Sequence, residues 1–340
     1  MALPSRRCAV RNEPKKETDH SSLPDENCTT RYESPRRRAE SMRMFLEKRS
    51  KTDPTVAPFL RRLKSCGLEL KYSRRSNGSK RLSGGRFCQH FFICPLCAMR
   101  RTIKLAYTYA ERVFHVLQDY PEAQLYFVGL TLRPSRSLPV DVARIQEYTT
   151  QLHKLGRDIR RGKRSIKKHS TEAAKIIASL QSIIIAEQNG NNLLRRPWRY
   201  MVRAHAIWLC DTPPRESLLS EEWRGITGGS FVVNIQDIKS NDKAVDYNAW
   251  LDSVGENLFA VCSYMLAASH LHDALRWDIF RQLKAASGRS PRLLVSRGEF
   301  YGVKLPDEEG PLSEGEQEFE KIYFLRWDRE QWRYRQVNNA

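Results

Sequence analysis

Four cysteines in the N-terminal third of the chain have the spacing of a metal site. Cys88, Cys94 and Cys97 lie within ten residues, and Cys66 precedes them in the pattern Cx(21)Cx(5)CxxC. Structural zinc takes four thiolate or imidazole ligands in a tetrahedron, and a CxxC turn presents two thiolates to one ion. Buried free thiols are the alternative, but three thiols this close together favour metal. The spacing therefore predicts a closed, structural Zn²⁺ site, with His90 as a substitute fourth ligand.

These cysteines lie in the most basic part of the sequence. The chain has 58 Lys and Arg against 39 Asp and Glu, a net charge of +19. Residues 61–112 contain 13 basic and two acidic residues, so this segment alone has a net charge of +11. Such a charge is typical of proteins that bind a phosphate-rich partner such as DNA. We expect the zinc module to present four arginines to phosphates: Arg81, Arg86, Arg100 and Arg101.

Changes in composition divide the chain into four segments. Residues 1–55 are charged and lack apolar periodicity, so we expect a disordered N-terminal tail. Residues 56–120 are the basic zinc module and its following helix, and residues 121–305 alternate strand and helix patterns. Residues 306–340 begin with many acidic side chains and are expected to be an acidic C-terminal tail.

The periodicity predicts an α+β fold, with strands and helices that follow the zinc module. Two strands around a loop with Asn189-Gly190 are expected to pair as a hairpin. The predicted helices are 98–119, 141–155 and 244–283, and the predicted strands are 124–133, 182–188, 199–210 and 230–238.

The sequence contains no apolar run of the roughly 18 residues that a membrane span needs. Its first residues lack the apolar core of a secretory signal. We therefore expect a soluble, cytoplasmic protein that does not contact membranes and whose cysteines are reduced.

The order of motifs resembles the Rep initiators of rolling-circle plasmids, which belong to the HUH class of endonucleases. The resemblance runs from about Cys66 to Val303. It depends on CPLCAMRR at the end of the basic module, on the strand FVGLTLRP, on a later strand with a histidine before apolar residues, and on a helix that contains a tyrosine. It implies an HUH-type nuclease core built on an antiparallel sheet.

The family's second motif is HxH on a strand, where both imidazoles bind a divalent metal that polarises the scissile phosphate. The matching tripeptide here is Arg203-Ala204-His205, so arginine replaces the first histidine. The resemblance implies that His205 holds Mg²⁺ or Mn²⁺, with Glu187 on the adjoining strand completing the site. Two alternatives remain open: Arg203 binds the phosphate directly without metal, or His205 is an ordinary core histidine.

The family's third motif is a helix with a nucleophilic tyrosine between lysines. The corresponding residue is Tyr264, but Ser263 and Ala267 stand where the lysines would be. The resemblance implies that Tyr264 is the nucleophile, with Tyr247 as the fallback, whereas a tyrosine on an apolar helix is ordinarily a core residue. A literal HxH at 270–272 lies in a helical segment, where side chains two apart diverge, so we expect no metal there.

Together these features imply a rolling-circle replication initiator. Such a protein would bind plasmid origin DNA, nick one strand with Tyr264 and keep the 5′ phosphate as a phosphotyrosine, using Arg203 and His205 in catalysis. Its partners would be origin DNA, single-stranded at the nick, and host replication proteins. Two alternatives are a DNA-binding protein of this family with a decayed nuclease site and a zinc-ribbon RNA-binding protein.

Overall fold

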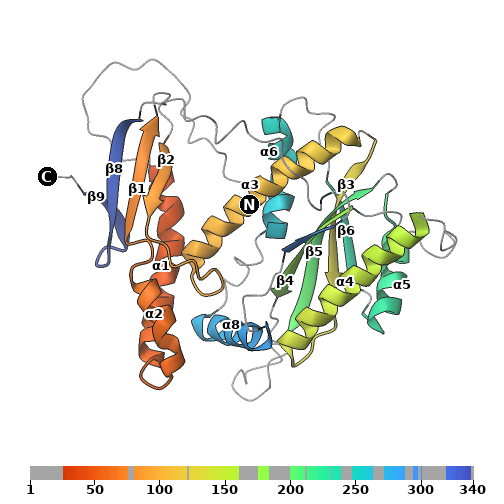
Figure 1. The fold of residues 1–340 in the computed structure, drawn as a ribbon, viewed down its shortest axis with the longest axis horizontal. Helices are drawn as coiled ribbons and strands as arrows, with labels where there is room; N and C mark the ends of the chain where they lie inside the picture. Colours follow the sequence, from red (N-terminus) through yellow and green to blue (C-terminus); the bar gives the residue numbers. More distant parts are fainter. Residues whose placement is uncertain are drawn as a thin grey trace. The chain divides into compact units, whose positions relative to one another are not determined.

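The chain folds into two compact units, each with its own antiparallel sheet (Figure 1). The described residues from Thr102 to Phe300 belong to the large unit, and residues 26–75, 80–101 and 319–337 belong to the small unit. Helix α3 (Pro95–Asp119) runs across the boundary in the sequence. The computed structural model describes residues 26–75, 80–120, 122–160, 175–183, 200–210, 213–230, 232–238, 247–262, 272–287, 294–297, 300 and 319–337.

The small unit joins the two ends of the chain in one four-stranded sheet. Strand β1 (Glu69–Arg75) pairs with β2 (Lys80–Gly85) on one side and with β8 (Phe319–Asp328) on the other, and β8 pairs with β9 (Arg333–Val337). The core of this sheet comes from both ends of the sequence: Leu70, Tyr72, Tyr323, Leu325, Trp327 and Tyr334 are all buried. The 3-10 turn Pro54–Val56 and helix α2 (Ala57–Lys64) precede β1.

The expectation of an acidic tail over residues 306–340 is wrong for its second half. In β8 the aromatic and aliphatic residues Tyr323, Leu325 and Trp327 are buried at every second position, and the residues between them are more exposed, which is the period of a half-buried strand. The acidic stretch before residue 319 masks this alternation in the composition. Residues 301–318 lie outside the described part of the chain.

The expectation of a disordered tail is also wrong for residues 26–55, because Glu26–Arg49 forms helix α1; residues 1–25 lie outside the described part of the chain. The helix is rich in charge, but the charges neutralise one another: the buried Arg36 guanidinium lies 2.7 Å from the Glu40 carboxylate. The guanidinium also lies over the Trp327 ring, 5.3 Å from its centroid. Contacts with β8 and β9 therefore stabilise a helix that charge alone would not predict.

The large unit contains a five-stranded antiparallel sheet in the order β6-β3-β5-β4-β7. The first strand of the predicted hairpin is misplaced, because β4 spans Lys175–Ile183 and overlaps the expected strand 182–188 only at residues 182 and 183. Strands β4 and β5 do pair antiparallel, but the expected turn at Asn189-Gly190 lies outside the described residues. The strands are β3 (Gln124–Thr131), β4 (Lys175–Ile183), β5 (Met201–Cys210), β6 (Val233–Ile238) and β7 (Leu294–Ser296).

Helices pack on this sheet. Ile207 and Leu209 of β5 lie in the same core cluster as Ala110 of α3 and Leu258 of α6. Helix α4 lies across the sheet and packs against α5 (Figure 1), where the buried Trp223 ring donates a 2.9 Å hydrogen bond to the Thr131 carbonyl. The helices are α4 (Leu138–Arg160), α5 (Glu216–Thr227), α6 (Tyr247–Cys262) and α8 (Asp273–Ser287).

These elements confirm a mixed α+β fold with antiparallel sheets. The strands expected near residues 124, 199 and 230 and the helices expected at 98–119 and 141–155 are all present, with ends shifted by a few residues. Among the helices described, none is both long and apolar enough to cross a bilayer.

Candidate metal centre and sheet-face site

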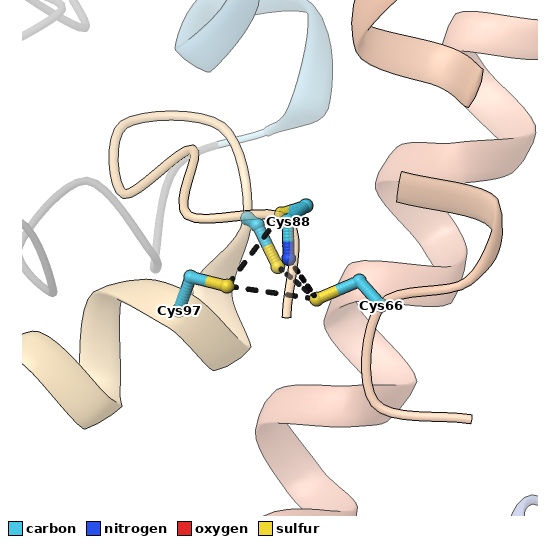
Figure 2. Close-up of side chains that lie close together, drawn as sticks. Cys66, Cys88 and Cys97 are labelled. Carbon is cyan, nitrogen blue, oxygen red and sulfur yellow. Dashed lines mark hydrogen bonds between the residues drawn. The ribbon is translucent and has the colours of Figure 1, made fainter. Parts of the chain in front are cut away.

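The four predicted cysteines converge in the small unit. Figure 2 labels three of them, Cys66, Cys88 and Cys97. Their sulfur atoms all lie within 4.8 Å of one another, and three pairs are 3.5 to 3.6 Å apart. Four sulfurs bound at about 2.3 Å to one tetrahedral ion would be about 3.8 Å apart, whereas a disulfide would need about 2.0 Å. The spacing of the sulfurs therefore fits a metal ion such as zinc and excludes disulfides.

Each ligand comes from the end of an element. Cys66 follows α2, Cys88 follows β2, and Cys94 and Cys97 flank the first residues of α3. His90 is not in the group; its Nε2 lies 3.5 Å from the Arg62 guanidinium. Cys66 is therefore the fourth member of the set, as the spacing predicted.

The electrostatics of the cluster call for a cation. All four thiols are at most 4% exposed. Burial raises the pKa of the Cys94 thiol, and the hydrogen bond with Cys66 raises the pKa of the Cys88 thiol. Hydrogen bonding by Cys66 lowers the pKa of the Cys97 thiol. A divalent cation would stabilise the thiolate form of all four ligands, and four ligands close its coordination shell.

The loop after Cys66 is held by the C-terminal hairpin. Gly67 has a φ of +65°, and a Cβ there would lie 2.3 Å from the Leu96 side chain, so only glycine fits. The Tyr334 hydroxyl of β9 donates a 2.7 Å hydrogen bond to the Gly67 carbonyl. Nothing in the local sequence signals this support, because its two partners are far apart in the chain.

The predicted DNA-contacting arginines differ in their surroundings. The Arg100 guanidinium lies 3.4 Å from the centroid of the Phe87 ring, and that of Arg101 lies 4.3 Å from the Phe91 ring centroid. Arg86 is exposed. For Arg81 the structure describes the backbone in β2 but not the side chain. The aromatic rings restrict the two stacked guanidinium groups near the metal centre.

A second candidate site lies on the sheet of the large unit. Arg203 and His205 are two apart on the central strand β5, so their side chains share one face. This is the face of Ile207, on which α3 and α6 pack. Both side chains are partly exposed, whereas the rest of β5 is buried.

The strand register fixes the neighbours of this pair. Gly129 and Ser179 lie opposite His205 in β3 and β4, and Thr131 and Gln181 lie opposite Arg203. Glu187, predicted to adjoin the pair, lies outside the described residues, and the β4 positions beside the pair belong to Ser179 and Gln181.

The polar atoms of this pair are incompletely satisfied. His205 Nδ1 and Arg203 Nε are buried and have no hydrogen-bond partner among the described residues. The Phe127 ring packs edge-on against the imidazole, with 5.1 Å between centroids. Burial, and then the charge of Arg203, lower the pKa of His205 to about 4. His205 is therefore neutral at pH 7.

This pKa predicts an acid-sensitive fold. Unfolded His205 takes up its proton near pH 6.5, whereas folded His205 stays neutral to about pH 4. The unfolded state thus binds more protons between these values, and the free energy of unfolding should fall by up to about 3 kcal/mol as pH drops through this window. Urea unfolding at pH 7 and pH 4.5 should show a smaller loss for His205→Gln than for wild type; equal losses would contradict the assignment.

The described surroundings of His205 do not fit a divalent metal. In the part of the chain that the structure describes, the one group of three or more metal-ligating side chains is the four-cysteine cluster. The residues that pair with His205 and Arg203 are Gly, Ser, Thr and Gln, none of them a carboxylate. One imidazole beside a guanidinium is a poor cation site.

The predicted nucleophile, Tyr264, lies outside the described residues, as does His270. Helix α6 ends at Cys262, two residues before Tyr264, and packs on β5 and β4. The Cys262 carbonyl accepts a 3.3 Å hydrogen bond from the Thr102 hydroxyl of α3. Tyr247, the fallback, is the first residue of α6, and its side chain is not described.

Comparison with known proteins shows a partial similarity to a curated protein. No family model matches the chain, and no solved structure matches it. The chain is 28% identical over 95 residues to the curated Protein rep of Streptococcus pneumoniae serotype 2 (strain D39 / NCTC 7466). The match covers 27% of this chain and 29% of that protein, well under two thirds of its length. Over about a quarter of its length, then, the chain is similar to a Rep protein.

Proposed function

We propose that this chain is a rolling-circle replication initiator of the HUH type. It binds a plasmid origin, nicks one strand and stays joined to the 5′ phosphate through a tyrosine. The similarity to a Rep protein supports the initiator class. The observation that carries the nicking reaction is the partly exposed Arg203 and His205 pair, on the sheet face where α6, the helix before Tyr264, packs. Host replication proteins in the cytoplasm would be its further partners.

The small unit is the proposed DNA-binding surface. Residues 54–68 and 80–101, which surround the four cysteines, contain no acidic residue. Phosphates are bound by such unpaired positive charge, and a bound zinc ion would fix the loops that present it. The cations with described side chains that are at least partly exposed in these segments are Arg61, Arg62, Lys64, Arg86, Arg100 and Arg101.

In the proposed reaction the Tyr264 hydroxyl attacks the scissile phosphorus. A bond forms between the tyrosine oxygen and phosphorus, the bond from phosphorus to the 3′ oxygen breaks, and the 3′ oxygen leaves with a proton. The phosphotyrosine keeps the energy of the phosphodiester for later rejoining. Arg203 would stabilise negative charge on the non-bridging oxygens. The positive charge of the Arg203 guanidinium would also favour ionisation of the attacking tyrosine hydroxyl, because a free tyrosine has a pKa near 10.

A divalent ion at His205, Mg²⁺ or Mn²⁺, would supply the same stabilisation as a Lewis acid. It would need Glu187 or another carboxylate as a second protein ligand. The described neighbours of His205 offer none.

The second candidate is a DNA-binding protein of the same family that no longer nicks. The replacement of the first motif histidine by Arg203, and of the lysines by Ser263 and Ala267, favours it. Incubation with labelled single-stranded origin oligonucleotides separates the two, because the initiator becomes covalently attached and the binding protein does not.

DNA affinity should fall steeply with salt. If the basic surface contacts six to ten phosphates, raising salt from about 50 to 200 mM should cost roughly 10³- to 10⁵-fold in affinity. Arg101→Ala should lower the slope of log affinity against log salt by about 0.9, the value of one phosphate contact. Arg224→Ala, a change of an exposed arginine on α5, is the control and should leave the slope unchanged. Fluorescence anisotropy measures both; a flat salt dependence would exclude this surface.

A further inference from the structure

We infer that the sheet-face site binds the scissile phosphate directly, through Arg203 and His205, and needs no metal ion. The identity of the phosphate as a DNA phosphodiester rests on the proposed function. The anion-binding character of the site rests on the residues themselves.

The first argument is the chemistry of the donor set. The two side chains lie on one face of β5, with Cα atoms about 7 Å apart at the rise of a strand. Two non-bridging oxygens of one phosphate can contact both groups across such a distance. A divalent cation at His205 would instead lie close to the fixed positive charge of Arg203, which repels it.

The second argument is the pair of unsatisfied atoms. Arg203 Nε is a buried donor without a partner in the described structure, and so is His205 Nδ1 if it holds the imidazole proton. A buried polar atom without a partner costs free energy. Because the Arg203 side chain is partly exposed, a phosphate on this face can pair with its guanidinium, whereas a metal bound to His205 would leave that positive charge unpaired.

The third argument is the space beside the pair. Gly129 lies opposite His205 in β3, and Asn234 of β6 lies opposite Gly129. A Cβ on Gly129 would lie 3.7 Å from Asn234 Cβ and 4.0 Å from His205 Cδ2. Because glycine has no side chain, the space between Asn234 and His205 on this face stays open. Glycine inside a strand often marks the close approach of a ligand. Along this face of the sheet, Arg203 offers a guanidinium, His205 an imidazole and Asn234 an amide, and these groups can bind an anion.

The test restores the histidine that the HxH motif has at the position of Arg203. Arg203→His places two imidazoles on one strand face, a pair suited to a divalent metal. Titration of the full chain with Mn²⁺, followed by electron paramagnetic resonance, should show a site that Arg203→His gains and wild type lacks. Wild-type Mn²⁺ binding that His205→Ala abolishes would overturn the inference.

Activity gives a second readout. Wild-type attachment to DNA should persist in EDTA. The EDTA concentration is chosen so that elemental analysis still finds zinc bound to the protein. Attachment by Arg203→His should depend on added Mn²⁺. Wild-type attachment that EDTA abolishes while zinc is retained would overturn the inference but leave the proposed function intact.

A third readout needs no nicking. Arg203→Gln should weaken binding of a short single-stranded oligonucleotide about tenfold, and Arg203→Lys should restore only part of it because lysine lacks the planar fork. Arg224→Gln is the matched control, and thermal melting by circular dichroism checks that each variant folds. Unchanged affinity in folded Arg203→Gln would overturn the inference. A tenfold loss in a protein that never attaches to DNA would support the inference while the proposed function fails.

Discussion

Cys94→Ala is expected to unfold the small unit and to reduce the metal content from one zinc per chain to none. Structural zinc contributes roughly 10 to 16 kcal/mol of apparent binding free energy, which matches or exceeds the 5 to 15 kcal/mol stability of a typical domain. Cys94 is fully buried, and its thiol lies 3.6 Å from that of Cys66. Elemental analysis gives the zinc content, and circular dichroism with limited proteolysis reports the unfolding.

Cys262→Ala is the matched control, because Cys262 is equally buried but lies in the core of the large unit. This variant should retain one zinc per chain. Its free energy of unfolding should fall only by the small contribution of one buried thiol. Wild-type protein purified without chelators that contains no zinc would contradict the metal assignment. A Cys94→Ala variant that melts like wild type would do the same.

Tyr264→Phe is expected to bind DNA as wild type does and to form no covalent adduct. Removal of the hydroxyl leaves no oxygen to attack the phosphorus, so the loss should be complete within detection, at least about 10³-fold. Arg203→Ala should slow attachment by about 10² to 10³, the usual effect of removing one charge-stabilising donor. Denaturing gel electrophoresis with a labelled oligonucleotide measures the adduct, and fluorescence anisotropy measures binding.

Tyr247→Phe is the control for this experiment, since Tyr247 begins α6 at the end opposite Tyr264. It should attach at the wild-type rate. If Tyr264→Phe attaches normally and Tyr247→Phe does not, the nucleophile lies at the start of α6.

The parts of the fold that the sequence predicts are those whose signals are local. A window of about twenty residues is enough to recognise the CxxC turn, the apolar stripe of α3, and strands β3 and β5 with their branched residues. Helix α1 and strands β8 and β9 do not, because they are stabilised by each other across the length of the chain. From the sequence alone, Arg36 and Glu40 would be assigned to the surface, because their burial depends on Trp327, which is far away in the chain.

The same limit applies to the sheet-face site. The sequence indicates that Arg203 and His205 share a face, because side chains alternate along a strand. It does not give the register, which places Gly129 and Ser179 beside His205 and opens the face toward Asn234. Register is set by contacts between strands far apart in sequence, so the local sequence cannot decide whether Glu187 lies beside Arg203 or His205.

Mass spectrometry of the covalent adduct tests the central claim most directly. The whole chain is incubated with single-stranded oligonucleotides that tile its coding DNA and the flanking sequence, and the products are digested with trypsin and nuclease. The tryptic peptide 244–276 contains both Tyr247 and Tyr264, so fragmentation must separate them. We predict a 5′-linked nucleotide on Tyr264 in wild type and none in Tyr264→Phe. The absence of any nucleotide-linked peptide, from every oligonucleotide and with or without divalent metal, would contradict the account and leave a protein that binds DNA without cutting it.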